Sequence, residues 1–196
     1  SLLKDKNEEE NLYPLELNFC PNCFNCQLSF TVPATQMFDD YLYVSSTNQT
    51  FRNHFSNMAD RFIQEFGLNQ ESFVLDIGSN DGVFLAPLKE NGIKILGVDP
   101  AENLVNLANS NGLETLHGFF DNKITDEIIA SKGRADIVTA FNVFAHADDL
   151  KSIAQNVFKV LKDSGIFIIE VQYLLDTIKD LTFDNIYHEH VNYWSV

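Results

Sequence analysis

The sequence predicts an α/β fold in which helices cover both faces of a doubly wound, mostly parallel sheet. Two observations support this class. After residue 50, short apolar runs alternate five times with helical patterns, which is typical of parallel strands joined by right-handed crossovers. The loops between them are short. Residues 1–50 lack this alternation and are expected to form a small N-terminal appendage, whereas residues 51–196 form the main domain.

The first regular element is a helix with one apolar stripe. Apolar residues recur at spacings of three and four, and the pattern stops at Gly67. The stripe consists of Phe51, Phe55, Met58, Phe62 and Phe66. Core packing explains this stripe better than a cofactor-binding role does.

Strands and helices then follow in alternation. The expected strands are residues 73–78, 94–99, 115–117, 135–140 and 165–171. The expected helices are residues 81–90, 100–112, 121–131 and 148–162. Asn91-Gly92 and Gly112 mark helix ends, and Pro100 suits a helix start.

Composition excludes several classes of function. The 196 residues include 13 Lys and Arg against 28 Asp and Glu, a formal net charge of −15. A field of this sign repels phosphate backbones and anionic membranes, so neither nucleic acid nor membrane is an expected partner. No apolar run approaches the roughly 20 residues that span a bilayer, and the first residues lack a secretory pattern, which favours a cytoplasmic location.

The segment after the first strand has the features of a nucleotide-type site. It contains Asp76, Gly78, Asn80 and Gly82, and glycines let a ligand approach the backbone near a helix N-terminus. The Gly-x-x-x-Gly spacing differs from the Gly-x-Gly-x-x-Gly of dinucleotide-binding oxidoreductases. Asp99, at the end of the second strand, can accept from both hydroxyls of a ribose. The alternative is that the glycines only turn the chain and Asp99 caps a helix.

These residues resemble the cofactor site of class I S-adenosylmethionine-dependent methyltransferases, which have a Rossmann-like fold. Phe119 or Phe120 could stack on the adenine of such a cofactor or pack in the core, and Asp121 could accept from the adenine amine. Asn142 could contact the methionine portion. The cofactor-binding residues expected are Asp76, Gly78, Asn80, Gly82, Asp99, Pro100, Phe119, Phe120, Asp121 and Asn142.

Titratable side chains gather near the C-terminus and after the fourth strand. Tyr187-His188-Glu189-His190 is one cluster, and His146 is close to the end of the fourth strand. Histidine is the usual general base near neutral pH, and a carboxylate can orient it. Two alternatives remain: a metal site formed by His188 and His190, or a surface loop of solvated histidines.

Four segments in order resemble the NDP-sugar C-methyltransferases of deoxysugar pathways, which methylate the carbon beside a keto group of a nucleotide-linked sugar. They are Cys20-Pro21-Asn22-Cys23, Asp40-Tyr41-Leu42-Tyr43, Asn142-Val143-Phe144-Ala145-His146 and Tyr187-His188-Glu189-His190. The resemblance implies that His190 removes the proton. It also implies that Tyr187 places the sulfonium methyl and Glu189 supports the base. Tyr41 and His146 would line the sugar pocket.

The cysteines suggest half of a zinc site. Cys20 and Cys23 have ligand spacing, Cys26 is a possible third ligand, and three crowded cysteines do not suit a disulfide framework. The family carries a second, upstream cysteine pair and a C-terminal domain that this sequence lacks, and Phe24 stands where the family usually has glycine. The resemblance therefore implies zinc in a full-length parent, and residues 1–50 as the remnant of a zinc-binding or substrate-covering module.

The expected reaction is thus S-adenosylmethionine-dependent C-methylation of an NDP-4-keto deoxysugar, through proton abstraction by His190 and an enolate. Two alternatives stay open. The chain could be an O- or N-methyltransferase of another small molecule, or a cofactor-binding remnant without full activity. The sequence leaves the oligomeric state and the identity of the sugar open.

Overall fold

The computed structural model describes residues 11–38 and 41–195. The acidic N-terminal end with Glu8, Glu9 and Glu10 lies outside the described residues, as do Asp40 and Val196.

The core is one parallel sheet of five strands in the order β5-β4-β3-β6-β7. The strands are β3 (Phe73–Ile77), β4 (Lys94–Asp99), β5 (Thr115–His117), β6 (Ala135–Phe141) and β7 (Leu161–Glu170). From β3 the chain first extends the sheet through β4 and β5, then returns to add β6 and β7 on the other side. This reversal confirms the doubly wound α/β class and creates a crevice at the carboxyl ends of β3 and β6, where open sheets bind ligands.

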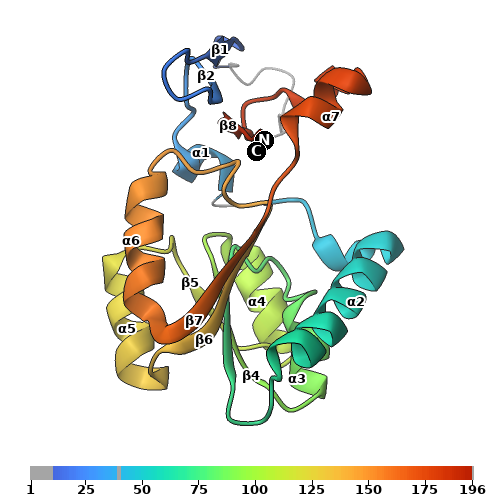
Figure 1. Cartoon of the computed structure of the whole chain (residues 1–196), viewed down its shortest axis with the longest axis vertical. Coiled ribbons are helices and arrows are strands. Elements are labelled where there is room, and N and C mark those ends of the chain that lie inside the picture. Colours follow the sequence, from blue (N-terminus) through green and yellow to red (C-terminus); the bar gives the residue numbers. More distant parts are fainter. Residues whose placement is uncertain (1–10, 39–40, 196) are drawn as a thin grey trace.

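Helices cover both faces of this sheet (Figure 1). They are α2 (Gln49–Phe66), α3 (Leu85–Glu90), α4 (Glu102–Ser110), α5 (Asn122–Lys132) and α6 (Leu150–Val160). Helices α2 and α3 pack on the face that carries Val74 and Ile137, whereas α5 and α6 pack on the face that carries Leu75 and Val138. Because successive strand residues point to opposite faces, the continuous apolar runs of the sequence fill both clusters.

Two element boundaries differ from the sequence-based expectation. Helix α3 begins at Leu85 and not at residue 81, because Asn80 and Gly82 have left-handed backbone angles with φ of 53° and 82°. Strand β7 begins at Leu161 and not at residue 165, because α6 ends at Val160 and Leu161 is already extended and paired with Ala135.

A second, small antiparallel sheet forms the upper lobe in Figure 1. Its strands are β1 (Leu17–Phe19), β2 (Cys26–Leu28) and β8 (Asn192–Tyr193), in the order β1-β2-β8. Leu28 and Tyr193 share a buried cluster with Leu174 of α7 (Leu174–Lys179). The lobe thus combines N-terminal strands with a strand close to the C-terminus. The expected division at residue 50 does not include this pairing of β2 with β8. That division itself stays a prediction.

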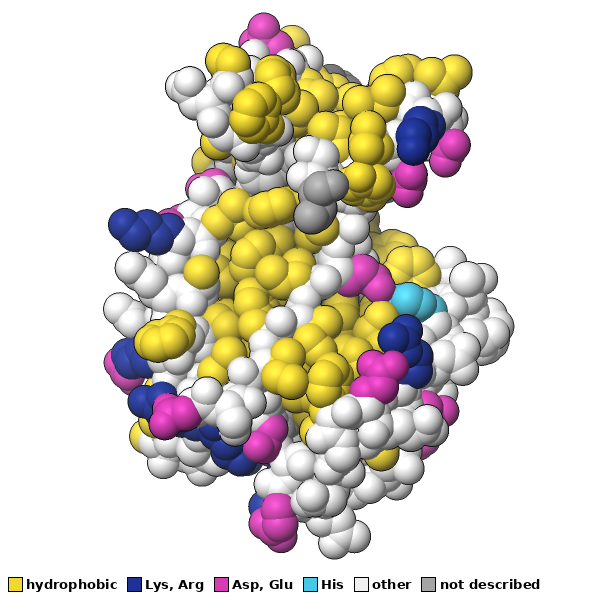
Figure 2. Space-filling model, in the orientation of Figure 1, with side chains coloured by type: hydrophobic (Ala, Val, Ile, Leu, Met, Phe, Trp, Pro, Cys, Tyr) yellow, Lys and Arg dark blue, Asp and Glu magenta, His cyan; other side chains and the backbone are white. Residues whose placement is uncertain are grey.

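Two short helices link the lobe to the sheet, and the edge strand β7 is partly exposed. The links are α1 (Ala34–Phe38) and the 3-10 helix η1 (Ser45–Thr47), and a second 3-10 turn, η2 (Phe183–Asn185), precedes β8. Figure 2 shows apolar side chains gathered in front of the edge strand β7, where Ile166 and Ile169 are exposed. Among the described residues, no helix is long and apolar enough to cross a membrane.

Candidate functional site

The larger cavity of the structure, about 870 Å³, lies at the carboxyl edge of the sheet. Its lining includes the residues that end or follow four strands: Gly78 after β3, Asp99 of β4, Asn142 after β6 and Gln172 after β7. Residues of the linking segment, such as Tyr41, close it from the side of the small lobe. The cavity therefore occupies the place where the sequence predicts a ligand.

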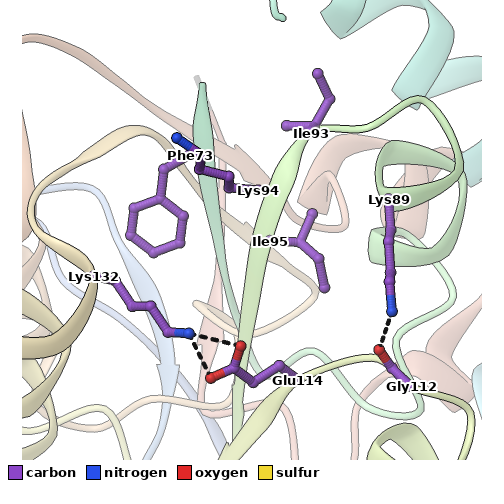
Figure 3. Close-up of a pocket in the computed structure, with 8 residues that line it drawn as sticks. All are labelled: Phe73, Lys89, Ile93, Lys94, Ile95, Gly112, Glu114 and Lys132. Atoms are coloured by element: carbon purple, nitrogen blue, oxygen red, sulfur yellow. Dashed lines mark hydrogen bonds and ion pairs between the residues drawn. The ribbon is translucent and has the colours of Figure 1, made fainter. Parts of the chain in front are cut away.

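A second cavity of about 340 Å³ lies at the opposite edge, around the first residues of β3 and β4 (Figure 3). Three lysines line it, but each has a partner. Lys132 forms an ion pair with Glu114 at 2.7 Å, Lys94 pairs with Glu71 at 2.8 Å, and Lys89 donates to the carbonyl oxygen of Gly112. These contacts give the lysines a structural role.

The turn after β3 is held by close packing. Gly78 has a φ of 65°, and a Cβ added there would lie 2.4 Å from Cγ2 of Val143. Only glycine combines this conformation with such an approach. Asp76, at the end of β3, is buried and accepts a hydrogen bond of 2.7 Å from the Thr139 hydroxyl. Burial raises the pKa of Asp76 to about 7, although the hydrogen bond from Thr139 lowers it.

Asp99 lines the cavity and also organises the backbone around it. Its Oδ2 accepts from the Asn80 amide at 2.8 Å, and its Oδ1 accepts from the Ala101 amide at 2.9 Å. Burial raises the pKa of Asp99, and the two amide hydrogen bonds oppose that rise. A carboxylate has about four acceptor positions, so two amide contacts leave room for two hydroxyls. The ribose-binding and the capping interpretations of Asp99 are therefore compatible.

The side chain of Asn80 holds a strap, defined here as residues 41–47, over the cavity. Its Oδ1 accepts from the Ser45 amide at 3.0 Å, and its Nδ2 donates to the Tyr43 carbonyl at 2.9 Å. Asp81 accepts from the Ser46 amide at 3.3 Å. On the far side, the side-chain Nδ2 of Asn103 donates to the Tyr41 carbonyl at 2.9 Å. The side chain of Asn80, expected to contact the cofactor, thus binds the strap in this structure.

The other expected cofactor residues separate into two groups. Pro100, Phe119, Phe120 and Asn142 line the cavity; Phe119 is 41% exposed, whereas Phe120 is 8% exposed and belongs to the core cluster.

Gly82 and Asp121 are not among the lining residues. A Cβ on Gly82 would lie 2.5 Å from Leu113, so this glycine serves packing. Asp121 accepts from the Ile124 amide at 2.9 Å and caps α5. Cap formation therefore accounts for Asp121, and its expected contact with adenine stays a prediction.

His190 has a defined hydrogen-bond pattern at the other end of the cavity. Its Nδ1 lies 2.8 Å from the Asn185 carbonyl oxygen, and its Nε2 lies 3.0 Å from the Tyr187 hydroxyl. Because a carbonyl can only accept, Nδ1 carries the proton and Nε2 accepts from Tyr187. Burial lowers the pKa of His190, whereas the hydrogen bond to Asn185 and the charge of Glu189 each raise it by less. The geometry leaves Nε2 as an available base.

A second neutral imidazole faces this base. The rings of His146 and His190 have centroids 5.1 Å apart and meet edge to face at 79°. Burial, together with the neighbouring His190, lowers the pKa of His146 to about 4. The amide of Val191 donates to the Ala145 carbonyl at 2.7 Å, which fixes the two segments against each other. His146 is therefore uncharged at neutral pH and can donate or accept a hydrogen bond.

Glu189 interacts with Tyr41, not with the ring of His190. The Tyr41 hydroxyl donates to Glu189 Oε2 at 3.0 Å, and burial raises the pKa of Tyr41 further than the nearby Glu189 charge does. The support of a base by Glu189 stays a prediction. The negative charge of Glu189 raises the pKa of His190, while the carbonyl of Asn185 orients the imidazole. No residue type signals that contact in the sequence, because it comes from the backbone.

The expected zinc site is not supported. Among the described residues, no group of three or more His, Cys, Asp or Glu side chains could hold a metal ion. Cys20, Cys23 and Cys26 are free thiols, and Phe24 has a φ of 59°, at the position where glycine was expected. The histidine alternative also fails: His188 contacts the Pro14 carbonyl at 3.3 Å, whereas His190 turns toward Tyr187.

The charge of the cavity favours a cationic ligand. The described residues that line the cavity include four acidic side chains, Asp76, Asp99, Asp148 and Glu189, and none of them is Lys or Arg. S-adenosylmethionine carries a positive sulfonium and a ribose with two hydroxyls, so the acidic lining and the remaining acceptor positions of Asp99 fit it. A diphosphate would find no Lys or Arg among these described lining residues.

Comparison with known proteins agrees with this geometry. A family model described as a methyltransferase domain matches residues 50–196. The chain is similar to the C-methyltransferase NovU of Streptomyces niveus, with 33% identity over 198 residues, covering 100% of this chain and 47% of that protein. A ubiquinone biosynthesis O-methyltransferase of Hydrogenovibrio crunogenus is 27% identical over 111 residues, 53% of this chain and 44% of that protein.

The chain thus spans about half the length of the curated relatives it matches. Among solved structures, a SAM dependent methyltransferase from Archaeoglobus fulgidus aligns with a TM-score of 0.58 and 22% identity, covering 74% of this chain and 63% of that chain. That likeness shows that the two share a fold.

Proposed function

Because the chain belongs to the methyltransferase-domain family and is an S-adenosylmethionine-dependent methyltransferase, we propose that it methylates carbon. The acceptor would be the carbon beside the keto group of an NDP-4-keto deoxysugar. The observation that carries the proposal is the neutral His190, whose Nε2 accepts from Tyr187 while Nδ1 donates to the Asn185 carbonyl. The likeness of the whole chain to a C-methyltransferase supports it.

The residues fit the roles of a carbon-acid reaction. His190 Nε2 takes the proton from the carbon beside the keto group, after the acceptor displaces the Tyr187 hydroxyl from it. Nδ1–H continues to donate to Asn185, which fixes the ring during the transfer. The negative charge of Glu189 favours the imidazolium that forms. The bound cofactor supplies an electrophilic methyl group on a sulfonium.

A carbon acid of this kind needs a hydrogen-bond donor at the developing enolate oxygen. His146 is suited to this role, because it is neutral and lies next to His190. Tyr41 is less suited in the observed arrangement, since its hydroxyl donates to Glu189. Each residue singled out for the reaction end lines the same cavity: Tyr41, His146, Tyr187, Glu189 and His190.

In the part of the chain that the structure describes, the cavity lining contains no Lys or Arg, which limits how the acceptor binds. We infer that the keto sugar enters the cavity and that the diphosphate remains outside the lining. The total charge of −15 also weakens the approach of such a substrate at long range.

Exchange of the substrate proton tests the proposal directly. The chain is incubated with S-adenosylhomocysteine and a dTDP-linked 4-keto-6-deoxyhexose in deuterium oxide, and the carbon-bound proton beside the keto group is followed by NMR. The proposal requires enzyme-dependent exchange, and with S-adenosylmethionine a new carbon-bound methyl signal. Methyl transfer without exchange, or neither event, overturns it.

O-methylation is the second candidate, because the matched relatives include O-methyltransferases. The same Nε2 of His190 could remove the proton of a hydroxyl. In the experiment above, this reaction yields an oxygen-bound methyl and no exchange at carbon. A cofactor-binding module without activity would bind S-adenosylhomocysteine in calorimetry and show no response to the sugar nucleotide.

A further inference from the structure

One buried side-chain donor belongs to a residue that lines the cavity and has no hydrogen-bond partner. Among the described residues, the side-chain nitrogen Nε2 of Gln172 is buried without a hydrogen bond, and Gln172 lines the cavity. Buried N–H groups nearly always have a partner, because an unpaired one costs free energy. The other lining residue with such an atom is Ser79, whose hydroxyl lies against Gly97 of β4.

The backbone holds Gln172 from both sides. Two residues before it, the Glu170 carbonyl accepts from the Asn142 backbone amide at 2.7 Å, which ties the ends of β6 and β7 together. Immediately after it, Tyr173 forms a bridge with Trp194, and the Leu174 amide donates to the Trp194 carbonyl at 2.8 Å. The chain passes here from β7 to α7 of the upper lobe (Figure 1). The side chain of Gln172 therefore starts from a fixed point at the junction of the two lobes.

The sheet order separates Gln172 from the Asp99 end of the cavity. Strands β3 and β6 lie between β4, which carries Asp99, and β7. Neighbouring strands are about 4.8 Å apart, so the two positions are separated by roughly 14 Å across the sheet. His146 follows β6, the neighbour of β7, and the backbone contact from Val191 to Ala145 holds His190 there too. Gln172 thus belongs to the end of the cavity that holds the base.

An unpaired amide N–H requires an acceptor from the ligand. A keto oxygen can only accept hydrogen bonds, whereas a hydroxyl can also donate one elsewhere. The described lining residues include no Lys or Arg that would bind this oxygen instead. We propose that Gln172 donates from Nε2 to the keto oxygen of the acceptor as a second donor beside His146, an inference that rests on the proposed function. When the C–H proton moves to His190 Nε2, the electron pair moves to that oxygen, and Gln172 stabilises the enolate without giving up its proton.

The test removes the donor while the shape of the side chain is kept. Gln172→Met has no N–H, and Gln172→Glu replaces the NH₂ group by a second carboxylate oxygen. Loss of one donor at a developing oxyanion reduces kcat by roughly 100-fold, so both variants should lose about that factor in turnover and in proton exchange. Their affinity for S-adenosylhomocysteine should stay within about threefold of the parent. Gln155→Glu, on the exposed side of α6, is the matched charge control and should behave like the parent.

The outcomes separate this inference from the function on which it rests. If the parent chain exchanges the proton and both Gln172 variants remain within twofold of it, Gln172 has no such role. If affinity for S-adenosylhomocysteine falls along with turnover, Gln172 is structural or binds the cofactor, and the inference is wrong. If the parent shows neither exchange nor transfer with the keto sugar nucleotide, the proposed function fails and the assignment of Gln172 fails with it.

Discussion

The hydroxyl of Tyr41 donates to the carboxylate of Glu189 at 3.0 Å, joining two residues 148 positions apart in the chain. This contact links the strap to the segment that carries the base. Asn103 holds the backbone of Tyr41 from the opposite side, at the start of α4. The contact with Tyr41 of the strap therefore helps to fix the position of Glu189, and with it the charge beside His190.

Removal of this hydroxyl should destabilise the chain measurably. Hydrogen bonds to charged groups contribute about 1.5–3 kcal/mol, so Tyr41→Phe should lower the free energy of unfolding by about that amount in urea denaturation. Tyr13→Phe is the matched control, because its hydroxyl donates to the neutral, exposed Gln36 at 2.8 Å, and its loss should be smaller. Equal losses of stability in the two variants would show that the hydrogen bond from Tyr41 to Glu189 contributes no more than the one from Tyr13 to Gln36.

The sequence predicts the sheet well because strands that are buried on both faces consist of consecutive apolar residues. Val74 and Leu75 are an example, since they pack in the clusters on opposite faces. The sequence also predicts that Asp99 and His146 line one cavity, since strand ends meet at one edge of the sheet. It cannot predict contacts made by the backbone, such as the Asn185 carbonyl on His190, nor the pairing of β8 with β2. Gly82 and Asp121 have the right residue types, but packing and capping account for them.

Gly78→Ala tests the close packing of the turn after β3. A side chain at a φ of 65° costs about 1 kcal/mol, and the added Cβ would meet Val143 at 2.4 Å, which should add about 1–3 kcal/mol of overpacking. Gly67→Ala is the matched control, because it has a φ of 62° and nothing within 4 Å. The variant at Gly78 should lose clearly more stability than the control, and a second substitution, Val143→Ala, should recover part of the difference. No recovery would mean that Val143 does not restrict this position.

His190→Gln separates the base from the binding residues. Glutamine retains a polar side chain of similar reach but cannot take up a proton at neutral pH, so turnover and proton exchange should be abolished. The affinity for S-adenosylhomocysteine, measured by calorimetry, should stay almost unchanged, because Asp99 and the turn at Gly78 lie at the other end of the cavity. A parallel loss of affinity would instead assign His190 to binding.

The burial of His146 predicts a dependence of stability on pH. Its pKa is lowered from 6.5 to about 4 in the folded chain, so the unfolded chain binds this proton first as the pH falls. The contribution of the neutral His146 to the free energy of unfolding is therefore complete above pH 6.5. It is lost between pH 6.5 and about 4, by up to about 3 kcal/mol. Asp76 acts in the opposite sense, because its pKa is raised to about 7 and its contribution is lost as the pH rises toward that value. A comparison with His146→Gln isolates the histidine: urea unfolding of the parent should lose more stability than the variant between pH 6.5 and 4, and parallel curves would show that His146 takes up its proton equally in both states.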